Sequence, residues 1–283
     1  MSIMKIRVYI LLIIIFSPLT IFCQSKFRLL DIETNKSIQF ATILNKSSSS
    51  FTFTDELGEF NLPIESLDSL IITHVSYVTK KILIDNSVEH NIYLKEKLND
   101  LNEVIIKNNV PTQIELNRDM TFYGLSLDRE YAIFINGGSE LNGKILTEII
   151  LPIKNKKNYS TDGILEISIV SADINNNLTD NLIIDPIYFK TNLLKEKISF
   201  KIPKNKVLNF ENNYFIVIKR IATNKVYNKK GLNTSVNPFI EVIKSVNGKK
   251  IYVKDTYNNR WIEITKKNYP FVPLFNLKFI YEK

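Results

Sequence analysis

The 283-residue chain has a single cysteine, Cys23, and only two histidines, His74 and His90. One cysteine cannot form a disulfide within the chain, so stability must come from buried apolar surface. Catalytic zinc needs three well-placed donors, and neither histidine has a glutamate at the spacing of a zinc-peptidase motif. The sequence therefore predicts no metal and no cofactor.

Motifs for covalent catalysis are also missing. The chain has no Gly-x-Ser-x-Gly elbow and no glycine-rich phosphate loop. A serine nucleophile would need one of the two histidines as its base. We expect a non-catalytic protein. Because acidic pairs assembled in space cannot be recognised in a sequence, a hydrolase with a carboxylate pair in the C-terminal part is the alternative.

Beyond the N-terminus the chain lacks any run of 18 apolar residues, so we expect no transmembrane helix. Lys5 and Arg7 precede nine apolar residues, Val8 to Phe16, which Ser17-Pro18 ends. This pattern predicts a signal peptide over residues 1–24 and an exported protein, which is periplasmic, outer-membrane-associated or extracellular. Lipoprotein signals place a small residue before the cysteine, whereas bulky Phe22 precedes Cys23. We expect no lipid anchor at Cys23.

The charge is basic but dispersed. The net charge is +8, and removal of Lys5 and Arg7 leaves 35 basic and 29 acidic residues. Nucleic-acid-binding proteins concentrate positive charge on one face or one helix, whereas here only short runs such as 154–157 occur. The pattern predicts a solvated surface and no nucleic-acid partner.

Almost every segment alternates like a strand, or forms a short β-branched and aromatic run between Asn, Gly, Asp or Ser turns. The strands expected in the first half are 26–30, 40–44, 50–54, 59–62, 69–75, 80–84, 91–94 and 103–106. Those expected in the second half are 131–136, 145–153, 164–171, 182–190, 197–202, 214–221, 238–243, 249–254, 260–265 and 275–281. This pattern predicts an all-β chain of antiparallel sandwiches.

Strand patterning is interrupted near 107–111, where Asn108-Asn109 and Pro111 occur. We therefore expect a first β-sandwich over 25–106, a linker over 107–111, and a larger, jelly-roll-like sandwich over 112–283.

The most informative segment is Thr54-Asp55-Glu56-Leu57-Gly58-Glu59-Phe60. Its composition predicts a tight turn in which Asp55 bonds nearby backbone amides and Gly58 adopts a positive φ. The chain around it carries further short patterns, in order: 31–37, Ala41-Thr42-Ile43, 68–77 and Leu101-Asn102-Glu103-Val104-Ile105-Ile106. Together with Thr54, Asp55, Gly58 and Phe60, these resemble the carboxypeptidase regulatory-like domain.

That resemblance implies a transthyretin-like, seven-stranded sandwich over the first domain. Domains of this family are accessories beside carboxypeptidase domains, in surface proteins, or at the front of TonB-dependent outer-membrane receptors. The resemblance thus implies a component of the bacterial cell envelope, and it leaves open an accessory subunit of a TonB-dependent uptake system.

A ligand site is expected in the C-terminal third, where aromatic residues gather. Trp261 follows a polar turn that includes Tyr257 and Arg260, and sugars stack on flat aromatic faces. The competing interpretation is that these rings pack between sheets. We therefore expect a binding or scaffold protein that contacts a glycan or an envelope protein, with Trp261, Tyr257 and Arg260 as the candidate ligand contacts.

Overall fold

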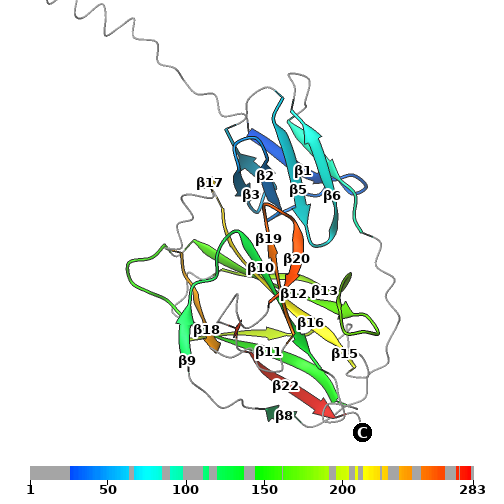
Figure 1. The fold of residues 1–283 in the computed structure, drawn as a ribbon, viewed down its shortest axis with the longest axis vertical. Coiled ribbons are helices and arrows are strands. Elements are labelled where there is room, and N and C mark those ends of the chain that lie inside the picture. The colour runs from blue at the N-terminus through cyan, green and yellow to red at the C-terminus, as the bar shows by residue number, and fades with distance from the viewer. Residues whose placement is uncertain are drawn as a thin grey trace, which may run out of the picture.

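A computed structural model gives the fold as an assembly of β-strands alone (Figure 1). It describes residues 26–63, 67–84, 90–97, 111–114, 120–136, 144–160, 162–190, 196–203, 208–209, 213–223, 225–228, 236–243, 250–264, 272–273 and 275–281. These residues form four sheets and contain no helix. The all-β, antiparallel sandwich architecture expected from the sequence is confirmed. The expected signal peptide over 1–24, Cys23 within it, and the expected strand 103–106 lie outside the described residues.

The N-terminal segment folds into two sheets. The first contains β4 (Glu59–Asn61), β1 (Lys26–Asp31) and β7 (Asn91–Leu94) in that order, and β1 and β7 are parallel. The second contains β3 (Ser50–Phe53), β2 (Thr42–Asn45), β5 (Ser69–His74) and β6 (Tyr77–Leu83), all antiparallel. Both sheets contribute to one apolar core, which includes Leu29, Ile43, Phe60, Leu70, Ile72 and Leu94.

The rest of the chain forms a larger sandwich. Its six-stranded sheet has the order β13 (Leu178–Lys190), β12 (Gly163–Ala172), β16 (Tyr214–Ala222), β10 (Arg129–Ile135), β19 (Ile251–Asp255), β20 (Arg260–Glu263). The facing sheet follows β21 (Val272–Pro273), β18 (Phe239–Ile243), β11 (Lys144–Lys154), β22 (Asn276–Tyr281), β8 (Pro111–Ile114). Strands β14 (Lys197–Lys201) and β15 (Leu208–Asn209) pair with β11, and β9 (Met120–Tyr123) pairs with β18. These pairings do not test the jelly-roll connectivity, which stays a prediction.

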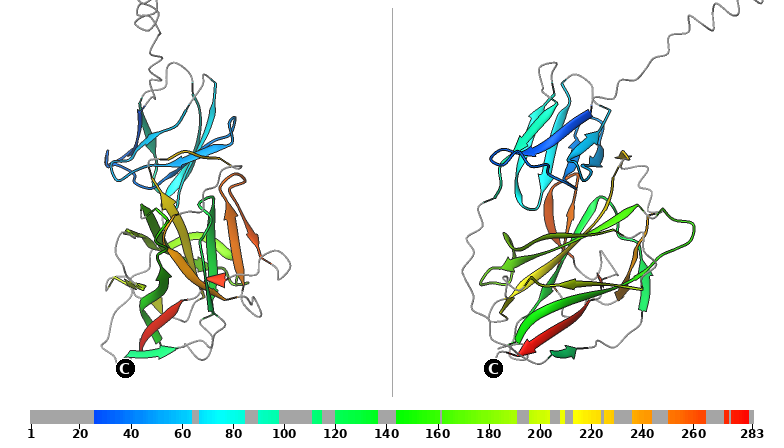
Figure 2. Two further views of the ribbon diagram at one scale, coloured as in Figure 1. Left: turned by 90° about the vertical axis from the view of Figure 1, so that its left-hand side faces the viewer. Right: turned by 180° about the vertical axis from the view of Figure 1, so that it is seen from behind.

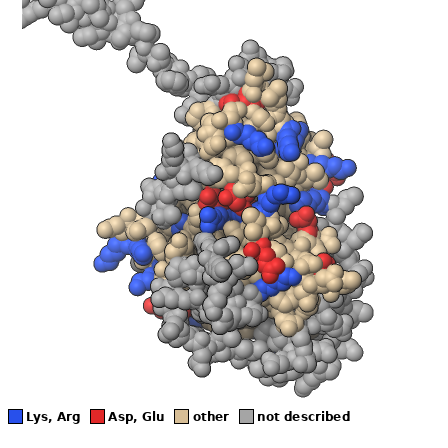
Figure 3. All heavy atoms as spheres, in the orientation of Figure 1, with Lys and Arg blue, Asp and Glu red and all other residues tan. Residues whose placement is uncertain are grey.

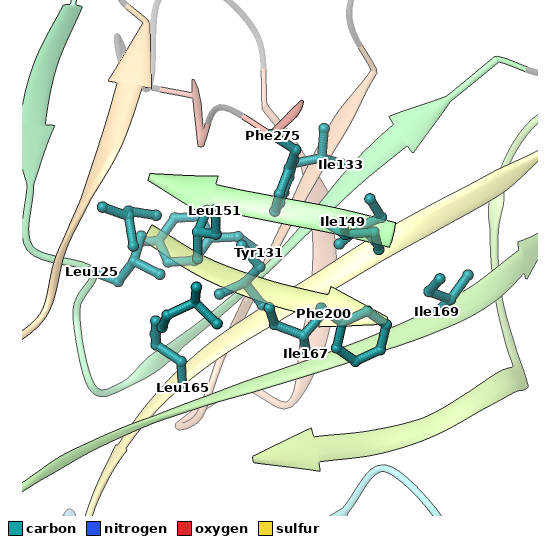
Figure 4. Close-up of a cluster of buried hydrophobic side chains, with 14 of the residues drawn as sticks. Leu125, Tyr131, Ile133, Ile149, Leu151, Leu165, Ile167, Ile169, Phe200 and Phe275 are labelled. Carbon is teal, nitrogen blue, oxygen red and sulfur yellow. The ribbon is translucent and has the colours of Figure 1, made fainter. Parts of the chain in front are cut away.

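The main core lies between these two larger sheets (Figure 4). Alternate residues of β12, such as Leu165, Ile167 and Ile169, point toward Leu151 and Phe200 of the facing sheet. Because side chains alternate along a strand, the residues between them point to the opposite face. That opposite face of the six-stranded sheet is directed toward the N-terminal sheets.

The six-stranded sheet is consequently a middle layer. All nine residues of β16 are buried, which is typical of a strand covered on both faces. One apolar cluster joins the two parts of the chain, with Phe40, Phe51 and Phe53 from the N-terminal sheet and Ile164, Ile221 and Tyr227 from the C-terminal part. The side and rear views show the N-terminal sheets seated at one end of the larger sandwich (Figure 2).

One strand pairing crosses the expected boundary at 107–111. Tyr227–Asn228 form β17, which pairs antiparallel with Phe51 and Ser50 of β3 and so extends the N-terminal sheet. Pro111, expected in the linker, begins β8 and lies opposite Ile280. One strand of the segment 112–283 therefore belongs to the N-terminal sheet. Its Tyr227 ring packs there against Phe51 and Phe53.

The turn over 54–60 has the hydrogen bonds that its residue types predict. Asp55 Oδ1 accepts the backbone N–H groups of Leu57 and Glu59, each at 2.9 Å. Thr54 Oγ1 accepts the N–H of Ala41 at 2.8 Å, and Phe60 enters the N-terminal core. Gly58 has φ +73°, and a Cβ there would meet the carbonyl oxygen of Leu29 at 2.6 Å.

We expect Gly58→Ala to lower the free energy of unfolding by about 1–3 kcal/mol, because alanine at this position is strained and clashes with the backbone of β1. Urea denaturation of the two proteins measures the change. Leu57→Ala is the matched control, since the neighbouring Leu57 is exposed and its truncation should cost little. Equal stability of Gly58→Ala and Leu57→Ala would contradict the prediction.

Candidate functional site

A row of side chains crosses the six-stranded sheet on the face turned toward the N-terminal sheets. In the strand register, each residue of this row lies directly opposite the next one, on the neighbouring strand. From β13 to β20 the residues are Tyr188, Glu166, Lys219, Glu130, Lys254 and Trp261. Opposite residues in a sheet share a face and lie within contact range. We call these six residues the charged row. Acids and bases alternate along it, and an aromatic ring stands at each end.

Lys219 is the buried centre of the charged row. Its Nζ donates to Thr42 Oγ1 of the N-terminal sheet at 2.8 Å and lies 3.6 Å from Glu130 Oε1. It also lies 5.5 Å from the centre of the Phe53 ring, close enough for a cation–π contact. The lysine side chain is only 5% exposed. A buried cation of this kind needs such partners because water no longer solvates it.

The two glutamates beside Lys219 have opposite shifts. Burial of Glu130 opposes its ionisation, but Lys254 and Lys219 together outweigh this and lower the pKa of Glu130. Burial raises the pKa of Glu166 to about 7, although the positive charge of Lys219 acts in the other direction. At neutral pH Glu130 is therefore an anion, while Glu166 exchanges its proton near pH 7.

His74 connects the end of β5 with the charged row. Its Nδ1 accepts the backbone N–H of Ser76 at 3.1 Å, so Nε2 carries the proton and donates to the Tyr188 hydroxyl, also at 3.1 Å. Burial, with the nearby charge of Lys219, lowers the pKa of His74 to about 3. The imidazole is thus neutral, and both ring nitrogens are already hydrogen-bonded.

A groove of about 240 Å³ lies at one end of the charged row, between β5–β6 and the six-stranded sheet. Trp261 forms part of its wall, with apolar Val170 and Val217. Hydroxyl and amide groups come from Thr73, Thr79, Thr179 and Asn259, and charged groups from Lys97, Glu130, Asp180 and Lys254. In the space-filling view, basic and acidic side chains lie side by side in the band between the N-terminal sheets and the sheet below (Figure 3).

A second hollow, of about 370 Å³, lies beside the 54–60 turn. Three of its four charged lining residues are already engaged: Lys26 pairs with Glu59 at 2.5 Å, and Asp55 accepts hydrogen bonds within the turn. The groove at Trp261 is therefore the better candidate for a ligand site.

The three ligand contacts expected from the sequence do not come together. Trp261 lines the groove, and Lys254 Nζ lies 5.7 Å from its ring centre. Tyr257 packs its ring against Phe51, with 5.9 Å between ring centres, as the competing interpretation for aromatics expects. Arg260 is exposed and pairs in register with Asp255, outside the groove lining.

Only one of the two glutamates of the charged row lines the groove. Glu130 lines the groove, whereas Glu166, the carboxyl with the raised pKa, lies beyond Lys219 and is not among the lining residues. Within the described part of the chain, no group of three or more His, Cys, Asp or Glu residues could hold a metal ion.

No protein-family model matches the chain, and no curated protein matches it. Solved structures similar to it include a VP2 subviral particle of infectious bursal disease virus, with a TM-score of 0.24, 6% identity, and coverage of 88% of this chain and 65% of that one. The structure of the Gx strain of the same virus has a TM-score of 0.23 and 8% identity, with coverage of 91% and 60%. The chain thus spans about 60–65% of the length of these capsid chains. A likeness at this level does not indicate a shared function.

We predict that Glu166→Gln changes how stability depends on pH. Because the folded-state pKa of Glu166 is raised from 4.5 to about 7, its contribution to stability is full below about pH 4.5 and is lost as the pH rises through 7. Glutamine cannot ionise. The stability of Glu166→Gln relative to wild type should therefore increase from pH 4 to pH 8, by on the order of 3 kcal/mol.

His74 has the opposite effect, because its pKa is lowered from 6.5 to about 3 and stability is lost as the pH falls below 6.5. Between pH 4.5 and 6.5 the two contributions oppose each other in wild type. Urea denaturation at several pH values separates the two contributions. His74→Gln removes the contribution of the histidine, so the remaining decrease in stability with rising pH is that of Glu166. Glu33→Gln, at an exposed position, is the control. A pH-independent difference between Glu166→Gln and wild type would refute the assignment.

Proposed function

We propose that this chain is an exported, non-catalytic binding protein of the bacterial cell envelope, which holds a glycan in the groove at Trp261. The observation that carries the proposal is the composition of this groove: one indole ring beside hydroxyl, amide and charged groups from both parts of the chain.

The groove has what a sugar requires. The C–H face of a pyranose ring is apolar and packs on an aromatic ring, while its hydroxyl groups need donors and acceptors around the rim. Trp261 supplies the ring, and Asn259, Thr79 and Asp180 supply the polar partners. A few placed polar groups beside apolar wall residues are typical of small-ligand sites.

A binding role fits the protonation states better than acid–base catalysis does. General acid catalysis needs a proton donor with a raised pKa in the cleft. Glu130, which lines the groove, is held as an anion, and the ring nitrogens of His74 are both hydrogen-bonded. Glu166, the carboxyl with the raised pKa, is set apart from the groove by Lys219.

Export and envelope location are supported by the sequence. The apolar run after Lys5 and Arg7 fits a signal peptide. The turn at Thr54, Asp55, Gly58 and Phe60 resembles the family whose members accompany envelope proteins. Within the described residues, the structure has no helix that is both apolar and long enough to span a membrane.

Glycan-array screening, followed by calorimetry on the best ligands, tests the proposal. We expect Trp261→Ala to weaken binding at least about tenfold, because the stacking surface is lost. Ile262→Ala is the matched control, since Ile262 is the next residue of β20, is exposed and lies outside the groove lining. Absence of glycan binding by wild type, or unchanged binding by a folded Trp261→Ala protein, would rule out this function for the groove.

A further inference from the structure

Lys97 enters the groove from a fixed stretch of backbone. Its N–H donates to the carbonyl oxygen of Ser76 at 2.9 Å, and the N–H of Val78 donates to Lys95 at 2.9 Å. Glu96 forms a bridge with Tyr77 in the same stretch. The backbone of Lys97 is therefore held against the β5–β6 turn. Lys97 is one of the residues that line the groove.

The ammonium group of Lys97 is partly buried without a close counter-ion. Within the described part of the chain, no carboxylate forms an ion pair with it, that is, none lies within 4.0 Å. Burial lowers the pKa of Lys97, Asp180 and Glu130 act to raise it, and the charge of Lys254 acts to lower it. The groove thus holds a cation that has lost part of its hydration and has no ion-pair partner among the described residues.

The other charged groups facing the groove are differently placed. Glu130 lies 3.6 Å from Lys219 and 3.5 Å from Lys254, so its charge is already shared by two lysines. Asp180 is exposed and lies among the groove-lining residues, at the start of β13. Lys254 lies over the Trp261 ring. Lys97 and Lys254 consequently repel each other across a space lined by an aromatic face.

An anionic group between these lysines would relieve that repulsion and give Lys97 a charge-assisted hydrogen bond. We infer that the ligand of the groove is an acidic sugar, a hexuronic acid residue whose ring lies on Trp261 and whose carboxylate binds Lys97. This inference rests on the proposed glycan-binding function and specifies its ligand class. A hexuronate fits because its ring and its carboxylate are separated by a single bond, and the groove lining combines the Trp261 indole with Lys254, 5.7 Å from the ring centre, and Lys97.

The test uses pairs of oligosaccharides that differ only at C6, with a hexuronate in one and the corresponding hexose in the other. Calorimetry of the full mature protein at low salt should give at least about tenfold tighter binding of the acidic member, the size expected for one charge-assisted hydrogen bond. Lys97→Gln should remove this preference, so that the acidic and the neutral member bind with equal affinity. The preference of the wild-type protein should decrease as salt is raised, because screening weakens the ion pair.

Lys95→Gln is the matched control, because Lys95 is exposed, lies two residues away and does not line the groove. It should keep the full preference for the acidic sugar. Equal binding of both members, abolished by Trp261→Ala, would overturn the acidic-sugar inference and leave the glycan-binding function standing. An acidic preference that persists in a folded Lys97→Gln protein would also overturn it. No binding of either member, with none on the wider array, would overturn both proposals.

Discussion

One buried cation sets the constraints for this molecule. Lys219 lies in the middle of the six-stranded sheet, under the N-terminal sheets, where it bonds Thr42 and faces Glu130 and Glu166. A buried charge is tolerated only with partners from every side, and breaking such a set leaves uncompensated charge in the interior. The burial of Lys219 therefore depends on the register of β10, β12 and β16, which places both glutamates opposite it, and on the hydroxyl that the N-terminal sheet supplies.

The groove is a consequence of the same junction. On the face toward the N-terminal part, the charged row separates two apolar clusters, one with Phe53 and Ile221 and the other with Val217 and Phe215. Val170 and Val217 of the second cluster line the groove, and Trp261 packs against this cluster. Because wall residues come from β5–β6 and from the larger sandwich, neither part alone forms the site.

Much of the strand pattern could be predicted, because strands covered on one or both faces have a plain apolar signature. Seventeen of the expected segments coincide with described strands, whereas two-residue strands such as β17 have no periodicity to detect. The charged row could not be predicted, since register across three strands brings Glu130, Glu166 and Lys219 together. A signal did exist: Glu166 is the single charge of apolar β12, and Lys219, followed by Arg220, interrupts the apolar run of β16. Tyr257, in the turn between β19 and β20, packs against Phe51, whereas Trp261 of β20 lines the groove, and their sequence context did not distinguish the two.

The short strand β17 affects how this protein can be dissected. Tyr227 covers Phe51 and Phe53 along the edge of the N-terminal sheet, and that edge is completed by a segment more than a hundred residues beyond it in the chain. A fragment cut at the apparent boundary would expose an aromatic strand edge with unpaired backbone groups, which is a surface prone to self-association. Expression of the N-terminal part by itself would thus give a fragment that self-associates. A peptide with the β17 sequence would pair with the exposed edge of β3 and keep the fragment soluble.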